Sequence, residues 1–199
     1  IEDTQFQGAI SPLFMSSSYQ YDGVDVKRYP RYFNTPNQEG LGKKIAALER
    51  SETGMIFSSG MAAVSHCLLA FLHKGDHVVM PQTLYGGTYN FVVEEFHKFG
   101  IEYTFATGFT EKDFAKAIKP NTKVLYVETP SNPLMKVTDL EIIARLAKQH
   151  SLVSMIDNTF ASPINQTPAD FGIDIMIHSA TKYMGCLLYT SPSPRDLKL

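Results

Sequence analysis

The chain has 199 residues, of which 44% are hydrophobic and 19% are charged, and its formal net charge is −2 at pH 7. This composition is typical of a soluble globular protein, and the lack of a basic cluster excludes an electrostatic surface for nucleic acid or an anionic membrane. The sequence has neither an apolar run long enough to span a bilayer nor the charged-then-apolar order of a signal peptide.

The cysteine content indicates a reducing compartment. The two cysteines, Cys67 and Cys186, form no disulfide framework and have no metal-ligand spacing, so we expect a cytoplasmic protein without a metal site. Cys67 lies in the apolar run "HCLLAFL" and is expected in the core.

The N-terminal segment differs in character from the rest of the chain. Residues 1–37 are polar and aromatic, rich in Ser, Tyr and Pro, and have no clear periodicity. We predict an arm that packs on something outside its own domain.

From about residue 38 the pattern alternates between helices and strands. Hydrophobic spacing and end signals predict helices over 39–51, 60–74, 86–100, 110–118 and 139–150, and strands over 76–81, 101–106, 123–129, 152–158 and 173–179. Strands that alternate with helices predict an α/β domain over 38–185, with a mainly parallel sheet covered on both faces.

The last segment, residues 186–199, breaks this alternation. It reads "CLLYTSPSPRDLKL" and carries two Ser-Pro steps, which disfavour helix. One interpretation is a flexible tail. The one we favour is a non-native tail, similar to translated sequencing-adapter sequence joined to an interrupted gene.

Three features bring chemistry to one edge of the predicted sheet. Asp157 ends one strand, Lys182 follows the next, and the N–H groups near Gly60 and Met61 open a helix that can hold a phosphate. Each alone has an ordinary alternative: a turn-forming Asp, a solvated Lys, a simple helix cap. Their joint order predicts a cofactor site.

The motifs along the chain resemble the Cys/Met-metabolism family of pyridoxal-phosphate enzymes, which includes cystathionine lyases, cystathionine γ-synthase, methionine γ-lyase and O-acetylhomoserine sulfhydrylase. The resemblance covers about residues 8–185 and is carried, in order, by "YPRYFNTPN", "SSGMAA", "TLYGGTYN", "VETPSNPLMKVTD", "IDNTFASP" and "HSATKY". It implies an aspartate-aminotransferase-like (fold type I) large domain, truncated here before a smaller C-terminal domain.

The resemblance also implies the cofactor, pyridoxal 5′-phosphate, and the residues that bind it. Lys182 would form the Schiff base and move the substrate α-proton, and Asp157 would keep the pyridine nitrogen protonated. The remaining residues would hold the phosphate and the ring: backbone groups of Gly60 and Met61, the hydroxyls of Ser179 and Thr181, and the side chains of Tyr85 and Asn132.

Two of these assignments have an ordinary alternative as well. Tyr85 would stack on the ring and donate a proton to the leaving group, although simple aromatic packing beside the Gly-Gly turn also fits. Asn132 would bond the phenolic oxygen of the cofactor, a role compatible with its place in a turn before proline.

Tyr29 and Arg31 are similar to the family's Tyr-x-Arg, which reaches the phosphate of a neighbouring subunit. This would explain the N-terminal arm and implies a homotetramer built from active-site dimers. A solvated basic patch is the alternative for Arg31. The family's "NPT" appears here as "NTPN", so the loop after Arg31 is expected to differ.

The function predicted from this resemblance is trans-sulfuration, of the cystathionine lyase or γ-synthase type. The substrate would be a small amino acid, with α-proton abstraction followed by elimination or γ-replacement. O-acetylhomoserine sulfhydrylase and methionine γ-lyase remain alternatives, the latter disfavoured because Gly87 stands where methionine γ-lyases carry cysteine.

Two non-enzymatic alternatives stay open. One is a non-catalytic α/β domain, although neither a "GxGxxG" nor a "GxxxxGK[ST]" motif is present. The other is an inactive fragment, since we expect the 199-residue chain by itself to be insoluble or inactive.

Overall fold

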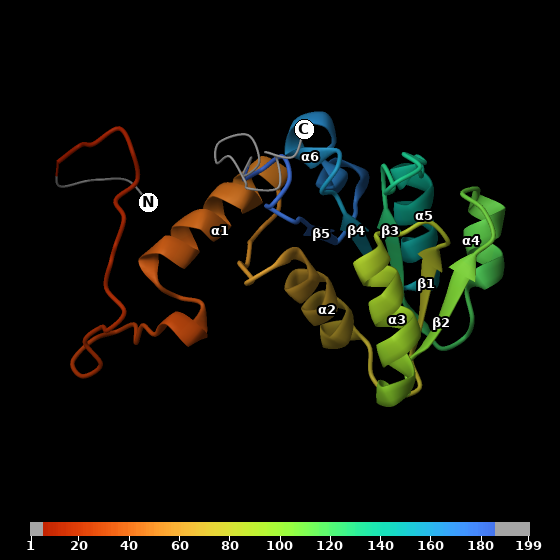
Figure 1. Ribbon diagram of the computed structural model, residues 1–199, viewed down its shortest axis with the longest axis horizontal. Helices are drawn as coiled ribbons and strands as arrows, with labels where there is room; N and C mark the ends of the chain where they lie inside the picture. The colour runs from red at the N-terminus through yellow and green to blue at the C-terminus, as the bar shows by residue number, and fades with distance from the viewer. Residues whose placement is uncertain (1–5, 186–199) are drawn as a thin grey trace, which may run out of the picture. The chain divides into compact units, whose positions relative to one another are not determined.

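The computed structural model describes residues 6–185, and these form two compact units that divide between Ile56 and Phe57 (Figure 1). The predicted non-native tail, residues 186–199, lies outside the described residues. Along residues 6–185, no helix is long and apolar enough to cross a lipid bilayer.

The first unit contains the N-terminal arm, with the 3₁₀-helix η1 (Pro30–Tyr32), and helix α1 (Pro36–Glu49). Thr35 caps α1: its hydroxyl accepts a hydrogen bond from the Gln38 N–H, and the Gln38 side chain accepts one from the Thr35 N–H. Pro36 occupies the first helical position, which needs no N–H donor. The "NTPN" order therefore contains the start of α1.

The second unit alternates helices and strands, as the sequence predicts. Its elements in chain order are α2 (Gly60–Phe71), β1 (His77–Pro81), α3 (Gly86–Phe99), β2 (Glu102–Ala106), α4 (Glu111–Ala117), β3 (Thr122–Glu128), α5 (Leu140–His150), β4 (Val153–Asp157), α6 (Ser162–Asn165), η2 (Pro168–Phe171) and β5 (Ile175–Ile177). The short elements α6 and η2, of four residues each, were not predicted because so few residues give no periodicity.

The five strands form one sheet in the order β2-β1-β3-β4-β5, and all neighbouring strands are parallel. The predicted α/β architecture is confirmed. After β1 the chain adds β2 on one side and then returns to add β3 on the other, so the strand order reverses between β1 and β3. In open α/β sheets, ligands bind beside such a switch point at the carboxyl ends of the strands.

Each face of the sheet is covered by helices that bury an apolar cluster. Leu68 of α2 and Phe96 of α3 belong to the cluster on one face, and Phe114 of α4 and Ile143 of α5 belong to the cluster on the other. In Figure 1, α3 lies in front of the strands and α5 behind them. Cys67, expected in the core, is only partly buried: it packs against the edge of the first cluster, and this burial raises the pKa of its thiol.

His77, at the start of β1, is fully buried at the end of the sheet opposite the strand carboxyl ends. Its Nδ1 lies 2.7 Å from Thr122 Oγ1 and its Nε2 lies 2.8 Å from Thr104 Oγ1. Burial, helped by the positive charge of Lys119 and opposed by Glu102, lowers the pKa of His77 to about 4.

This depressed pKa predicts acid sensitivity of the fold. The unfolded chain binds a proton at His77 near pH 6.5, whereas the folded chain does so only near pH 4, so stability present above pH 6.5 is lost as pH falls toward 4. The loss is on the order of 3 kcal/mol. Urea unfolding of wild type and His77→Gln should therefore give different pH dependences between pH 6.5 and 4, with the variant less sensitive. Parallel curves would contradict the assignment.

Candidate active site

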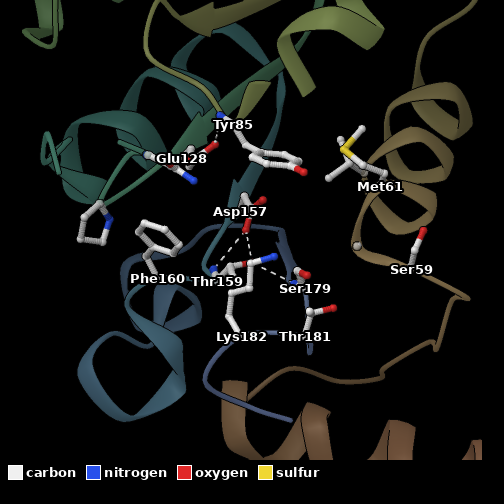
Figure 2. A pocket seen from close by; sticks show the side chains of 14 residues that line it. Ser59, Met61, Tyr85, Glu128, Asp157, Thr159, Phe160, Ser179, Thr181 and Lys182 are labelled. Carbon is white, nitrogen blue, oxygen red and sulfur yellow. Dashed lines mark hydrogen bonds between the residues drawn. The ribbon is translucent and has the colours of Figure 1, made fainter. Parts of the chain in front are cut away.

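The second unit contains a cavity of about 300 Å³ at the carboxyl ends of its strands (Figure 2). The residues that line it come from the start of α2, the loop after β1, the ends of β3 and β4 and the segment after β5: Ser59, Gly60, Met61, Val64, Tyr85, Glu128, Pro130, Asn132, Asp157, Thr159, Phe160, Ser179, Thr181 and Lys182. A cavity of this size accepts a small-molecule ligand or cofactor.

Two carboxylates stand side by side at the centre of this edge. Glu128 and Asp157 are register partners at the ends of β3 and β4, on the face that packs against α2 and α3. Glu128 is 5% exposed. Burial raises the pKa of Glu128 to about 7; two backbone N–H bonds oppose this rise, and the charge of Asp157 adds to it.

Asp157 is held by a short chain of hydrogen bonds, drawn as dashed lines in Figure 2. Thr159 donates both its hydroxyl and its backbone N–H to Asp157 Oδ1, and the Thr159 hydroxyl in turn accepts the Ser179 N–H at 2.8 Å. Burial raises the pKa of Asp157, whereas the Thr159 bonds and the charges of His178 and Lys182 lower it. This carboxylate is therefore placed to accept a proton or a cationic N–H group from a ligand.

The start of α2 forms the anion-binding part of the cavity. Ser59 caps the helix by accepting the Ala62 N–H at 3.1 Å, and the N–H groups of Gly60 and Met61 lie in the first turn, where no intrahelical acceptor exists. Ser179 and Thr181 line the cavity with them, and the positive end of the helix dipole favours an anion there. These groups suit a phosphate.

Gly60 is required by close contact rather than by backbone conformation. A Cβ atom added to Gly60 would lie 2.7 Å from Ser179 Cβ and 3.1 Å from Ser179 Cα. Because part of this obstruction is backbone, an alanine would force the start of α2 and the Ser179 segment apart.

We expect Gly60→Ala to weaken phosphate-ester binding in the cavity by about ten- to a hundredfold, the loss expected when a bond to a charged group is broken. Gly86→Ala is the matched control, because a Cβ atom there would meet nothing within 4 Å. Titration of both variants with pyridoxal 5′-phosphate, followed by absorbance, checks this. Equal affinities in the two variants would contradict it.

Lys182 and Tyr85 complete the cavity. Lys182 follows β5, and its Nζ lies 6.0 Å from the centroid of the Tyr85 ring; the side chain is otherwise exposed. Figure 2 shows the Tyr85 ring on the opposite side of Asp157 from the Lys182 stem. The cavity thus offers an amine, an aromatic face, a buried carboxylate and an anion cradle, a set that fits a planar ring bearing a phosphate and a carbonyl group.

The structure brings most of the predicted site residues together. Those that line the cavity are Gly60, Met61, Tyr85, Asn132, Asp157, Ser179, Thr181 and Lys182. Tyr29 and Arg31 belong to the first unit, where Arg31 Nη1 donates to Tyr29 Oη at 3.2 Å. The structure therefore pairs these two side chains with each other.

Other cavity residues were missed by sequence reasoning. Glu128 could have been noticed as the only charged residue within the apolar run "VLYVE", and Thr159 as a hydroxyl two residues after Asp157. Ser59 follows from its place as the cap of α2. Phe160 carries no sequence signal that separates it from a core aromatic.

Comparison with known proteins places this chain in a known enzyme family. The family model described as Cys/Met metabolism PLP-dependent enzyme matches residues 1–186. In Bacillus subtilis (strain 168), cystathionine beta-lyase MetC is 44% identical over 174 residues, covering 87% of this chain and 43% of that protein. Cystathionine gamma-lyase of the same organism is 42% identical over 181 residues, 89% of this chain and 48% of that protein.

A third relative carries a different activity in its name. Cystathionine gamma-synthase/O-acetylhomoserine (thiol)-lyase of B. subtilis is 41% identical over 182 residues, covering 89% of this chain and 48% of that protein. The chain therefore spans about half the length of the curated relatives it matches.

Solved structures give the same result for the fold. The metB protein from Corynebacterium glutamicum matches with a TM-score of 0.88 at 36% identity, over 93% of this chain and 49% of that one. Cystathionine gamma-lyase from Lactobacillus plantarum, complexed with L-serine, matches with a TM-score of 0.87 at 36% identity, over 92% and 48%. The α/β fold described above is that of these enzymes over about half of their chains.

Proposed function

Because this chain belongs to the Cys/Met metabolism family of pyridoxal-phosphate-dependent enzymes, we propose that its cavity binds pyridoxal 5′-phosphate and serves a trans-sulfuration reaction. The observation that carries the proposal is the convergence of Lys182, Asp157 and the Gly60 cradle on one cavity. A non-catalytic α/β domain without a cofactor would not require these three groups to line the same cavity.

The described residues divide the work of binding the cofactor. The N–H groups of Gly60 and Met61 and the hydroxyls of Ser179 and Thr181 bind the phosphate. Asp157 receives the ring nitrogen, and its buried carboxylate keeps that nitrogen protonated. Lys182 would hold the cofactor covalently through its amine, and the cofactor would supply an electron sink for negative charge at the substrate α-carbon.

Lys182 and Tyr85 handle protons in this proposal. Once the substrate amine has replaced Lys182 on the cofactor, the freed Lys182 Nζ would take the α-proton of the amino-acid substrate, and the Tyr85 hydroxyl would give a proton to the departing group. Asn132, which lines the same cavity, bonds the phenolic oxygen of the cofactor. Tyr85 also covers the ring as an aromatic face.

The reaction we propose is cleavage or formation of cystathionine. Two relatives of similar identity are named cystathionine lyases, and a third is named for γ-synthase and thiol-lyase activity, so O-acylhomoserine replacement is the second candidate. Methionine γ-lyase is less compatible. A Cβ atom at Gly87 would lie 2.6 Å from Tyr85 Cε1 and 3.0 Å from Met61 Sδ, so a cysteine there would displace these side chains.

We further propose that the N-terminal arm meets a second copy of the chain. Its exposed apolar side chains include Ile10, Leu13 and Met15, and a face of this kind is normally covered in solution. Arg31, paired with Tyr29, would then reach the phosphate bound by the neighbouring subunit.

Product analysis tests the proposed reaction, with protein produced from its complete gene. β-Elimination of cystathionine with water yields homocysteine, pyruvate and ammonia, whereas γ-elimination yields cysteine, 2-oxobutyrate and ammonia. Replacement joins an O-acylhomoserine and cysteine into cystathionine and releases the free acid. We expect cystathionine to be cleaved or formed. Turnover of an O-acylhomoserine with sulfide alone would support the second candidate, and no turnover of any of these would contradict the proposal.

A further inference from the structure

The proposed chemistry leaves one buried acid of the cavity unused. Glu128 Oε2 accepts the backbone N–H of Tyr85 at 2.7 Å, and Glu128 Oε1 accepts the backbone N–H of Asn132 at 2.8 Å. Each oxygen of one carboxylate therefore holds the backbone of a different residue that faces the cofactor site. We call this arrangement the Glu128 clamp.

The clamp spans the switch point of the sheet. Tyr85 lies in the loop that follows β1, whereas Glu128 ends β3 and Asn132 lies in the loop that follows it. β1 and β3 are the strands between which the strand order reverses. No helix or strand joins the two loops directly, so the carboxylate fixes one against the other.

Fold stability alone does not explain a carboxylate at this position. Glu128 is buried, and its ionised form is disfavoured there, since burial raises its pKa to about 7. The other charged side chains that line the cavity are Asp157, which raises this pKa further, and Lys182. Its hydrogen-bond partners are neutral backbone amides. Burying a carboxylate without an opposite charge beside it lowers the free energy of unfolding.

We propose that Glu128 is a positioning residue, which sets the separation of Tyr85 and Asn132 and so the slot into which the cofactor ring fits. This inference rests on the proposed function, because Tyr85 and Asn132 are the ring-contacting residues there. A side chain with two acceptors is needed, since a single acceptor can hold only one of the two loops.

The unmodified protein without cofactor gives the first test. The amides of Tyr85 and Asn132 lie outside the intrahelical and sheet hydrogen bonds, so their protection depends on Glu128. Hydrogen exchange at single-residue resolution should show both amides exchanging at least about tenfold more slowly than unbonded loop amides. Exchange at the unbonded rate would overturn the clamp, with no variant needed.

A pair of variants separates positioning from simple loss of stability. Glu128→Gln keeps the shape but replaces one acceptor by an amide NH₂ group, which faces a backbone donor. Ser154→Ala is the control: Ser154 is also buried, also makes two hydrogen bonds, both with Asp174, and does not line the cavity.

We expect Glu128→Gln to speed exchange of Tyr85 or Asn132 about tenfold and to reduce the visible circular dichroism of bound pyridoxal phosphate. Affinity for the cofactor should fall about ten- to a hundredfold. Ser154→Ala should leave all three unchanged. Equal changes in both variants, or unchanged exchange in Glu128→Gln, would overturn the proposal.

The experiments distinguish failure of the proposed function from failure of the Glu128 clamp. If pyridoxal phosphate does not bind the wild-type protein, the proposed function fails, but the exchange rates still decide whether Glu128 holds the two loops. If the cofactor binds and the exchange rates do not depend on Glu128, the clamp fails alone.

Discussion

Replacing Lys182 by alanine is expected to lower kcat for the trans-sulfuration substrate by at least about 10³-fold, because in the proposed function this residue provides both the covalent attachment of the cofactor and the general base. Lys182→Arg should be nearly as inactive, since a guanidinium keeps the charge but does not condense with an aldehyde. The measurement is steady-state kinetics with the substrate identified by product analysis.

Lys148→Ala is the control for this experiment. Lys148 is an exposed lysine near the end of α5, on the face of the sheet away from α2 and α3, and it does not line the cavity. Its replacement should leave kcat within about twofold, as expected for a surface site remote from the reacting atoms. Wild-type kcat in Lys182→Ala would rule out the proposed role.

Replacing Asp157 by asparagine should have the next largest effect, a fall in kcat of about 10²-fold or more. Burial already raises the pKa of Asp157, so the carboxylate is stabilised when a protonated ring nitrogen faces it. Asparagine occupies the same volume but carries no charge, so the ring nitrogen loses its proton and the electron sink weakens. The absorbance of the bound cofactor should also change, because its protonation state differs.

The matched control is Asp174→Asn. Asp174 also accepts hydrogen bonds from a side chain and from backbone, through Ser154, but it lies outside the cavity. The Asp174→Asn variant should have a lower free energy of unfolding than the wild type. Its kcat and the absorbance of its bound cofactor should be unchanged. A normal kcat in Asp157→Asn, with cofactor bound, would contradict the ring-nitrogen assignment.

The parts of the site that could be predicted are those governed by strand direction. Asp157 ends β4 and Lys182 follows β5 in one parallel sheet, and the carboxyl ends of such strands share an edge. Gly60 and Met61 could be predicted because a helix start is recognisable in sequence. The hydrophobic pattern that predicts the strands therefore also predicts the positions of Asp157 and Lys182.

Other features depend on contacts that the sequence does not encode locally. That Gly60 must lack a side chain follows from the approach of Ser179, a residue far away in the chain. The role of Glu128 required knowing that two loops converge on it. "NTPN" was expected only to differ, and its meaning as the capping box at Thr35 emerged from the backbone.

The placement of Tyr29 and Arg31 against a phosphate stays a prediction. They contact each other within the first unit, and the proposed target lies on another copy of the chain. Local pattern fixes the helix that follows them, but not what the arm binds. A contact between subunits leaves no periodic signal in one sequence.

The most direct test of the central claim is reduction with sodium borohydride in the presence of pyridoxal 5′-phosphate, followed by peptide mapping by mass spectrometry. We predict a stable phosphopyridoxyl group on Lys182, at the cavity formed by Asp157, Tyr85 and the Gly60 cradle. A label found only on other lysines, or no label at all on protein from the complete gene, would contradict it.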